Sequence, residues 1–267
     1  MPAQQENALA FNPNNLDLTR VAVLNRTISA GIERVWENVL DWEHLPHLHD
    51  TSFSYCDLIE GGEWGWRTWA NPDETGHIEL CVDRPASRYV ARTYSAGHQI
   101  SEIWTDLKPE GEQTEIEVAF WAPDVDPDRR ERFGEAYLTL YQQLWDEDEA
   151  MMQERTRQLT ARRSRASRVD LGPRAALTLP VTIEMMGNRF SIDTDGDQLR
   201  VDPLVCPHLL GPLSVDGDGN LHCPWHGYRF DAETGQCLSP PGATCRLPRK
   251  PVVTEQDGNI ILADPNS

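Results

Sequence analysis

The sequence has no long apolar run. The stretch from Met1 to Arg20 is polar and lacks the apolar core of a secretory signal peptide, and no later run is long enough to span a bilayer. Basic residues are few, because 24 Lys and Arg stand against 43 Asp and Glu, for a net charge of −19. Phosphate surfaces repel such a chain, so neither nucleic acid nor a membrane is an expected partner. The sequence therefore predicts a soluble cytoplasmic protein.

Other signatures are also missing. The chain has no internal repeat, no G-x-G-x-x-G dinucleotide fingerprint and no cysteine run of the plant-ferredoxin type. Redox chemistry in this chain would therefore need electrons from a separate protein. The six cysteines of a cytoplasmic protein are expected to be thiols or metal ligands rather than a disulfide framework.

The first part of the chain combines strands with a long helix. Residues 21–29 read as a strand and residues 30–40 as a helix, and alternating apolar and polar segments separated by turns follow them. After Pro127 the apolar period becomes helical and continues to about Leu159. We predict an α+β helix-grip domain over residues 1–160, in which a curved sheet holds a helix and encloses an apolar cavity. Four tryptophans are candidates for the cavity lining: Trp64, Trp66, Trp69 and Trp104.

The composition then changes. Six arginines fall between Arg155 and Arg168, and Gly172-Pro173 follows. The arginines suit a solvated helix C-terminus, where cations complement the helix dipole, or alternatively a docking patch for an acidic redox partner. Residues 161–173 are predicted to be a linker. Short strands and Gly/Asp turns over residues 174–267 predict a second, all-β domain.

The second domain contains a distinctive ligand pattern. Cys206-Pro207-His208 is followed, after fourteen residues, by Cys223-Pro224-Trp225-His226. Each half supplies one thiolate and one imidazole, which suits a binuclear iron centre held by two Cys on one iron and two His on the other. A Cys₂His₂ zinc site needs the same residue types, but C-x-H paired with C-x₂-H is unusual for zinc.

These two segments resemble the Rieske fingerprint, in the form found in Rieske oxygenases and their ferredoxins. The extra cysteines of respiratory Rieske proteins are absent here. The resemblance implies a [2Fe–2S] cluster bound by Cys206, His208, Cys223 and His226. The spacer is slightly short for the family, which implies a trimmed loop around residues 216–220. Two further cysteines lie outside the motif and receive no role: Cys237 and Cys245.

A second resemblance lies in the first domain. The pattern Asn38-x-x-Asp41-x-x-His44, with His49 five residues later, is similar to the mononuclear-iron motif of Rieske oxygenase catalytic subunits. The resemblance implies that His44 and His49 bind Fe(II) and that Asp41 connects this iron to the cluster by hydrogen bonds. It also implies a third ligand, a carboxylate on the long helix. The remaining histidines receive no functional assignment.

Helical geometry selects among four consecutive acids. At about 100° per residue, Asp148 lies within roughly 40° of Leu144 and continues the apolar stripe. Glu147 is roughly 60° off on the other side, and Asp146 and Glu149 point away. Because a buried carboxylate is costly without a metal or cation, Asp148 is the predicted ligand. Two His and one carboxylate form the donor set of non-haem Fe(II) oxygenases.

The resemblance has an alternative. The first domain also resembles the larger helix-grip (START-like) superfamily of lipid-transfer proteins, polyketide cyclases and aromatase-like proteins, most of which bind no metal. There the segment from Asp41 to His49 would cap the cavity for structural reasons. In addition, the order of the two domains is the reverse of that in Rieske oxygenases, whose Rieske domain comes first.

The sequence thus favours a Rieske non-haem iron mono- or dioxygenase acting with O₂ on a small organic substrate, aromatic or hydrophobic. By resemblance, its electrons come from a separate reductase or ferredoxin, and it is a homo-oligomer, most simply a trimeric ring. The second hypothesis is a Rieske electron-transfer or redox-sensing protein whose first domain binds a hydrophobic ligand without catalysis. Convergence of His44, His49 and Asp148 on one point would favour the oxygenase.

Overall fold

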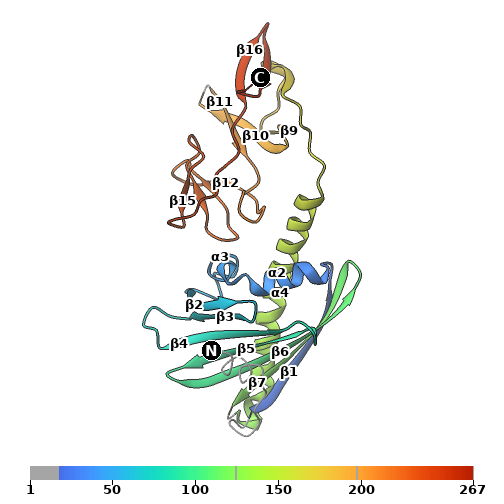
Figure 1. The fold of residues 1–267 in the computed structure, drawn as a ribbon, viewed down its shortest axis with the longest axis vertical. Coiled ribbons are helices and arrows are strands. Elements are labelled where there is room, and N and C mark those ends of the chain that lie inside the picture. Colours follow the sequence, from blue (N-terminus) through green and yellow to red (C-terminus); the bar gives the residue numbers. More distant parts are fainter. Residues whose placement is uncertain (1–17, 124, 197, 267) are drawn as a thin grey trace. The chain divides into compact units, whose positions relative to one another are not determined.

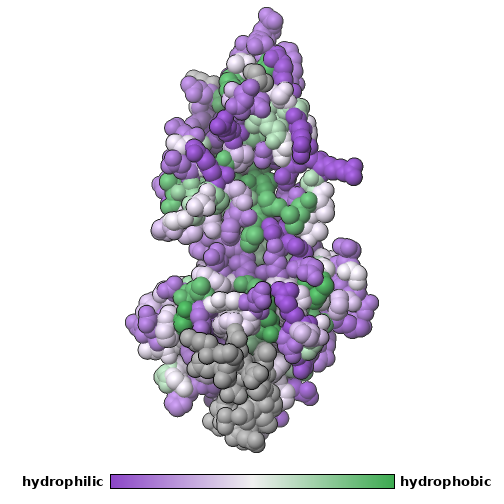
Figure 2. Space-filling model, in the orientation of Figure 1, coloured by the Kyte–Doolittle hydropathy of each residue, from purple (hydrophilic) through white to green (hydrophobic). Residues whose placement is uncertain are grey.

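A computed structural model describes residues 18–123, 125–196 and 198–266. The chain divides into two compact units, one up to Gln153 and one from Glu154 onward (Figure 1). On the face drawn in Figure 2, both units present mainly hydrophilic residues, as expected for a chain with 25% charged residues. None of the helices in the described ranges is both long and apolar enough to cross a bilayer.

The first unit is built on a seven-stranded antiparallel sheet in the order β1-β7-β6-β5-β4-β3-β2. Hairpins connect β2 to β7 in sequence, and β1 returns to pair with β7. The strands are β1 (Leu18–Ile28), β2 (Asp57–Gly62), β3 (Gly65–Trp69), β4 (Gly76–Asp83), β5 (Arg88–Ser95), β6 (His98–Glu110) and β7 (Gln113–Pro123).

Helices cover one face of this sheet. Between β1 and β2 lie α2 (Ile32–Leu40), the 3₁₀ turn η1 (Trp42–His44) and α3 (Leu45–Leu48). After β7 come η2 (Pro127–Arg129) and the long helix α4 (Arg130–Thr160). The sheet curves around α4, as Figure 1 shows, which is the START-like helix-grip arrangement predicted from the sequence.

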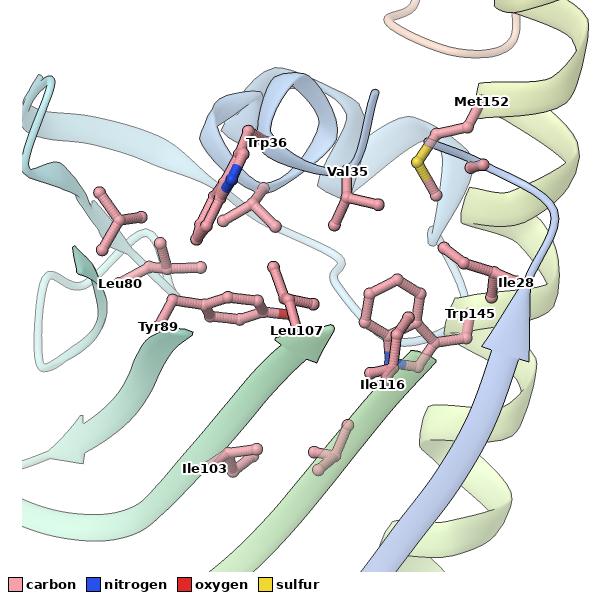
Figure 3. Packing of buried hydrophobic residues seen from close by; sticks show 14 of the residues in the cluster. Ile28, Val35, Trp36, Leu80, Tyr89, Ile103, Leu107, Ile116, Trp145 and Met152 are labelled. Atoms are coloured by element: carbon pink, nitrogen blue, oxygen red, sulfur yellow. The ribbon is translucent and has the colours of Figure 1, made fainter. Parts of the chain in front are cut away.

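The core lies between the sheet and the helices. In β7, Ile116, Val118 and Phe120 are buried while the alternating Glu115 and Glu117 are exposed, because successive strand side chains point to opposite faces. Apolar residues of α2 meet them at helical spacing. Figure 3 shows this core, with side chains from α2, α4 and several strands: Val35, Trp36, Trp145, Met152, Tyr89, Leu107 and Ile116.

The second unit consists mainly of short strands in three antiparallel sheets, β11-β10-β9, β12-β13-β14-β15 and β16-β17-β8. They are β8 (Arg168–Pro173), β9 (Val181–Met185), β10 (Asn188–Asp195), β11 (Gln198–Pro203), β12 (Ser214–Val215), β13 (Leu221–His222), β14 (Arg229–Phe230), β15 (Cys237–Ser239), β16 (Val252–Gln256) and β17 (Asn259–Ala263), with the 3₁₀ turn η3 (Arg174–Ala176) after β8. The first and third sheets supply a core that includes Phe190, Ile192 and Leu262.

The segment between the domains is more ordered than a linker. Residues 168–173, the second half of the predicted linker 161–173, form β8 and pair with β17. The division between the units also falls earlier than the predicted boundary at residue 160, since the last turns of α4 belong to the second unit. Val169 and Leu171 favour a strand, but the arginines around them made this segment resemble a solvent-exposed linker in the sequence.

Candidate metal centres

The first candidate centre lies where the short helices after α2 meet α4. Helix α2 ends at Leu40, because Asp41 leaves the helical region with φ −90° and ψ 82°. The chain then turns through η1 and α3, with Pro46 in the first turn of α3. This places His44 at the end of η1 and His49 just after α3, and both are buried, with 3% and 1% of their surface exposed.

The two imidazoles converge on a carboxylate of α4. Oδ1 of Asp148 lies 3.4 Å from Nε2 of His44 and 3.0 Å from Nε2 of His49. The two rings are 5.2 Å apart between centroids, and one ligand atom from each of the three residues lies within 4.8 Å of the others. Asn38 donates from Nδ2 to the same Oδ1 at 2.9 Å and so holds the carboxylate. The structure therefore brings together the three residues singled out in the sequence.

The far nitrogen of each ring faces another carboxylate. Nδ1 of His44 is 3.7 Å from Oδ2 of Asp41, and Nδ1 of His49 is 2.5 Å from Oε2 of Glu147. Sequence reasoning included Asp41 but missed Glu147, because the helical phase placed that residue between inward and outward positions. The signal that would have found it is chemical: a buried imidazole that uses one nitrogen for a metal needs an acceptor on the other.

At this centre, His44 and Asp148 shift each other's pKa values. Burial by itself lowers the pKa of His44, but hydrogen bonds and charges from Asp148 and Asp41 outweigh it and raise that pKa to about 9. Burial by itself raises the pKa of Asp148, but the two imidazoles lower it well below its usual range. Asp148 thus stays a carboxylate in a buried position, where either a protonated imidazole or a bound metal ion can compensate its charge. Two imidazole nitrogens and one carboxylate oxygen around one point fit a non-haem Fe(II) ion.

The neighbouring acids have a different task. Asp146 and Glu149 both pair with Arg26 of β1, at 2.9 and 2.7 Å, and Glu149 also accepts from the backbone N–H of Ser29 at 2.7 Å. They point away from the centre, as the helical phase predicted, and tie α4 to the first strand.

A cavity of about 130 Å³ adjoins this centre. Its walls are mainly apolar, with contributions from α2, α4 and strands β3 to β6. Burial raises the pKa values of Tyr89 and Tyr141, so the two hydroxyls in the wall remain protonated. The other lining residues, besides Asn38, Asp41 and the three converging side chains, are Val39, Leu45, Phe53, Trp66, Ile78, Leu80, Ala91, Thr93, Ile103, Leu144 and Trp145.

Among the four tryptophans predicted as lining, Trp66 is the one that borders this cavity. Its indole N–H donates to the Val39 carbonyl at 2.9 Å and fixes the end of α2 against β3. The prediction is wrong for Trp64, Trp69 and Trp104. Side chains at an odd spacing along a strand point to opposite faces of the sheet. Trp69 lies three residues after Trp66, and Trp104 lies one residue after the cavity residue Ile103, so both point away from the cavity. Trp64 lies in the turn before β3.

The second candidate centre is formed by two loops of the second unit. One follows β11 and carries Cys206 and His208; the other joins β13 to β14 and carries Cys223 and His226. Backbone hydrogen bonds close each loop, from Cys206 N–H to Gly211 O and from Cys223 N–H to Tyr228 O, both at 2.8 Å. The two cysteines and His226 are buried.

The four predicted ligands are adjacent within this unit. The rings of His208 and His226 are 4.8 Å apart between centroids and nearly perpendicular. A hydrogen bond to Cys223, together with burial, raises the pKa of the Cys206 thiol, and the same hydrogen bond lowers the pKa of Cys223. The sulfurs therefore lie side by side, as the imidazoles do. Two thiolates beside two imidazoles fit a [2Fe–2S] cluster in which one iron takes sulfur and the other takes nitrogen.

Gly211 makes room for this cluster pocket. A Cβ at this position would lie 2.8 Å from Sγ of Cys223 and 2.7 Å from the Trp225 ring. We expect Gly211→Ala to displace one of these side chains, to lower cluster content and to destabilise the domain by about 1–3 kcal/mol through overpacking. Iron and sulfide analysis and thermal unfolding measure both effects. Gly217→Ala, which meets no atom within 4 Å, is the matched control; equal results for the two variants would contradict this account.

The part of the chain that carries the second centre matches a known family. Residues 167–254 match the model of the Rieske [2Fe–2S] domain family. This part of the chain is therefore a Rieske domain, with all four predicted cluster ligands inside it.

Two curated relatives share part of the sequence. A cholesterol 7-desaturase of Caenorhabditis elegans is 31% identical over 90 residues, which are 30% of this chain and 21% of that protein. The oxygenase component of dicamba O-demethylase of Stenotrophomonas maltophilia is 38% identical over 78 residues, which are 24% of this chain and 22% of that protein. The chain spans about a fifth of the length of these relatives.

Solved structures resemble each half of the chain distantly. The ZhuI aromatase/cyclase of a Streptomyces species is 12% identical and covers 54% of this chain and 99% of its own, with a TM-score of 0.42. The ferredoxin of carbazole 1,9a-dioxygenase of Nocardioides aromaticivorans is 24% identical and covers 37% and 99%, with a TM-score of 0.29. Similarity at this level says nothing about activity.

Proposed function

We propose that this protein is the oxygenase component of a Rieske non-haem iron system. In this proposal the Rieske domain delivers electrons to a mononuclear Fe(II) held by His44, His49 and Asp148. The observation that carries the proposal is the convergence of these three side chains on one point beside an apolar cavity. Iron held by these three residues would supply the activation of O₂ for oxidation of a bound organic molecule.

The residues around the site have separate tasks. His44 and His49 present their Nε2 atoms, and Asn38 orients the Asp148 carboxylate. The apolar wall excludes water from the bound substrate. Tyr89 and Tyr141 also border the cavity, and burial raises the pKa of both hydroxyls, so that they add no charge to it.

Cavity size supports a small substrate. The volume of about 130 Å³ is close to that of an engineered apolar cavity of roughly 150 Å³ that binds benzene. A molecule with one aromatic ring therefore suits the site, and a sterol is far too large for this conformation of the wall.

Electron delivery sets requirements on partners. The chain has neither a dinucleotide fingerprint nor a plant-type ferredoxin run, so a separate cytoplasmic reductase or ferredoxin supplies the electrons. Asp41 beside His44 is the proposed point of entry, reached from His226 of a Rieske domain. A homo-oligomer, with three chains in a head-to-tail ring, satisfies this requirement when the His226 belongs to a neighbouring chain.

Metal analysis of anaerobically purified protein tests the proposal. We expect about three irons per chain, two in the cluster and one mononuclear, and the low-average-g paramagnetic signal of a Rieske centre after reduction. Two irons per chain with the same signal would instead favour an electron carrier or redox sensor whose first domain only binds a ligand. Colourless protein with stoichiometric zinc would exclude both.

A further inference from the structure

We propose that Glu147 is a positioning residue that fixes the His49 ring so that Nε2 faces the metal. This inference rests on the proposed mononuclear site and adds to it a residue outside the ligand set. It concerns a carboxylate that lies next to the ligand Asp148 in sequence but meets the opposite side of the same imidazole.

The two nitrogens of His49 contact consecutive residues of α4. Nδ1 lies 2.5 Å from Oε2 of Glu147, and Nε2 lies 3.0 Å from Oδ1 of Asp148. A neutral imidazole has one N–H donor and one acceptor nitrogen, whereas a carboxylate only accepts. With a metal held between Nε2 and Asp148, Glu147 accepts from Nδ1–H and so holds the tautomer that leaves the lone pair of Nε2 for that metal. His49 is 1% exposed, so in the folded chain its ring meets protein groups rather than bulk water.

Glu147 is itself held in place. Gln143, one helical turn earlier, donates from Nε2 to Oε1 of Glu147 at 2.9 Å, and the same amide group contacts Oγ1 of Thr51 at 3.3 Å. Thr51 lies two residues after His49. The contacts thus run from the His49 segment to α4 and back, so that each oxygen of Glu147 has a defined partner and the ring has one orientation.

The arrangement around His49 parallels that around His44. Each ring has a carboxylate on its far nitrogen, Asp41 for His44 and Glu147 for His49. Asp41 comes from the same segment as its histidine and serves as the proposed electron entry. Glu147 comes from α4, which also carries Asp148, so one helix supplies a ligand and the support of another. Such partners orient the ring and make the liganding nitrogen more basic, and their loss costs about 10- to 100-fold in metal affinity.

Manganese titration of the full-length protein tests this role. After the mononuclear metal is removed with a chelator, Mn²⁺ is added while the cluster stays oxidised and paramagnetically silent. The free Mn²⁺ signal then gives the affinity, and the bound spectrum reports the geometry. We expect Glu147→Ala to bind Mn²⁺ about 10- to 100-fold more weakly than the parent, with an altered bound spectrum. Glu147→Gln, whose carbonyl oxygen still accepts from Nδ1, should fall between the parent and Glu147→Ala.

Two further variants complete the design. Glu135→Ala removes an exposed carboxylate from the same helix and should bind Mn²⁺ as the parent does. Gln143→Ala removes the hydrogen bond that holds Glu147 but keeps the carboxylate, so it should also weaken Mn²⁺ binding. This variant provides the test if Glu147→Ala does not fold. Parental affinity in Glu147→Ala, or equal loss in Glu147→Gln and Glu147→Ala, overturns the positioning role. Failure of the parent itself to bind Mn²⁺ overturns the mononuclear site instead.

Discussion

Replacing His44, His49 or Asp148 with alanine is expected to reduce the iron content from about three to about two per chain. Each replacement removes one of the three donors that converge on a single point, and Asp148→Ala also removes the carboxylate that both imidazoles face. Losing a ligand should cost more than losing a supporting residue, so metal affinity and O₂-dependent turnover should fall more than about 100-fold. The Rieske spectrum should stay unchanged, because the cluster ligands all lie in the other unit.

Two acids on the same helix are the matched controls. Asp146→Ala and Glu149→Ala should retain the parental iron content, since these side chains pair with Arg26 and not with the histidines. Asp146 is largely exposed, so its loss should cost roughly 1 kcal/mol of unfolding free energy or less. Iron analysis with paramagnetic quantification of the cluster distinguishes the outcomes. If all five variants keep the parental iron, the mononuclear site does not exist.

Two inactive variants are expected to restore turnover when they assemble together. Cys206→Ala removes a cluster ligand and leaves the first unit intact, whereas His44→Ala removes a mononuclear ligand and leaves the cluster intact. In a head-to-tail ring, electrons pass from the cluster of one chain to the mononuclear site of its neighbour. Random assembly of equal amounts places an intact cluster beside an intact mononuclear site at about one interface in four. The unfractionated mixture should therefore recover about a quarter of the parental turnover per chain, and isolated mixed trimers, which have one productive interface in three, about a third.

Different affinity tags on the two variants allow mixed oligomers to be isolated, and each variant assembled alone is the inactive control. A mixed oligomer that forms but stays inactive would show that each chain uses its own pair of centres. A protein that is monomeric in solution would contradict the proposed ring. The mononuclear site would then be tested by iron analysis alone.

The four residues proposed as cluster ligands form the clearest pattern in the sequence. Cys206 and His208 are two residues apart, Cys223 and His226 three, so each half of the motif is a local feature that needs no tertiary information. The curved sheet and long helix were also predictable, because strand alternation and helical periodicity follow from burial of one face. The strand β8 was missed, since its pairing with β17 joins residues about 90 positions apart.

The acids of α4 show where such prediction stops. Helical phase alone separated Asp148 from Asp146 and Glu149, because the direction of a side chain around a helix follows from its position in the sequence. It did not reveal Glu147, whose importance depends on where the second nitrogen of His49 points. That direction is set by the turn through η1 and α3, which packs His49 against α4 from nearly a hundred residues away in sequence.

By itself, the sequence indicated the Rieske domain with four candidate ligands, the two-domain order and the helix-grip architecture. These follow from local spacing and periodicity, which a linear chain displays directly. Only the tertiary structure decided that His44 and His49 face one carboxylate, that Glu147 contacts one of them, and that Trp66 borders the cavity while Trp69 and Trp104 do not. These features depend on contacts between segments far apart in the chain, whose orientation is set by packing rather than by sequence pattern.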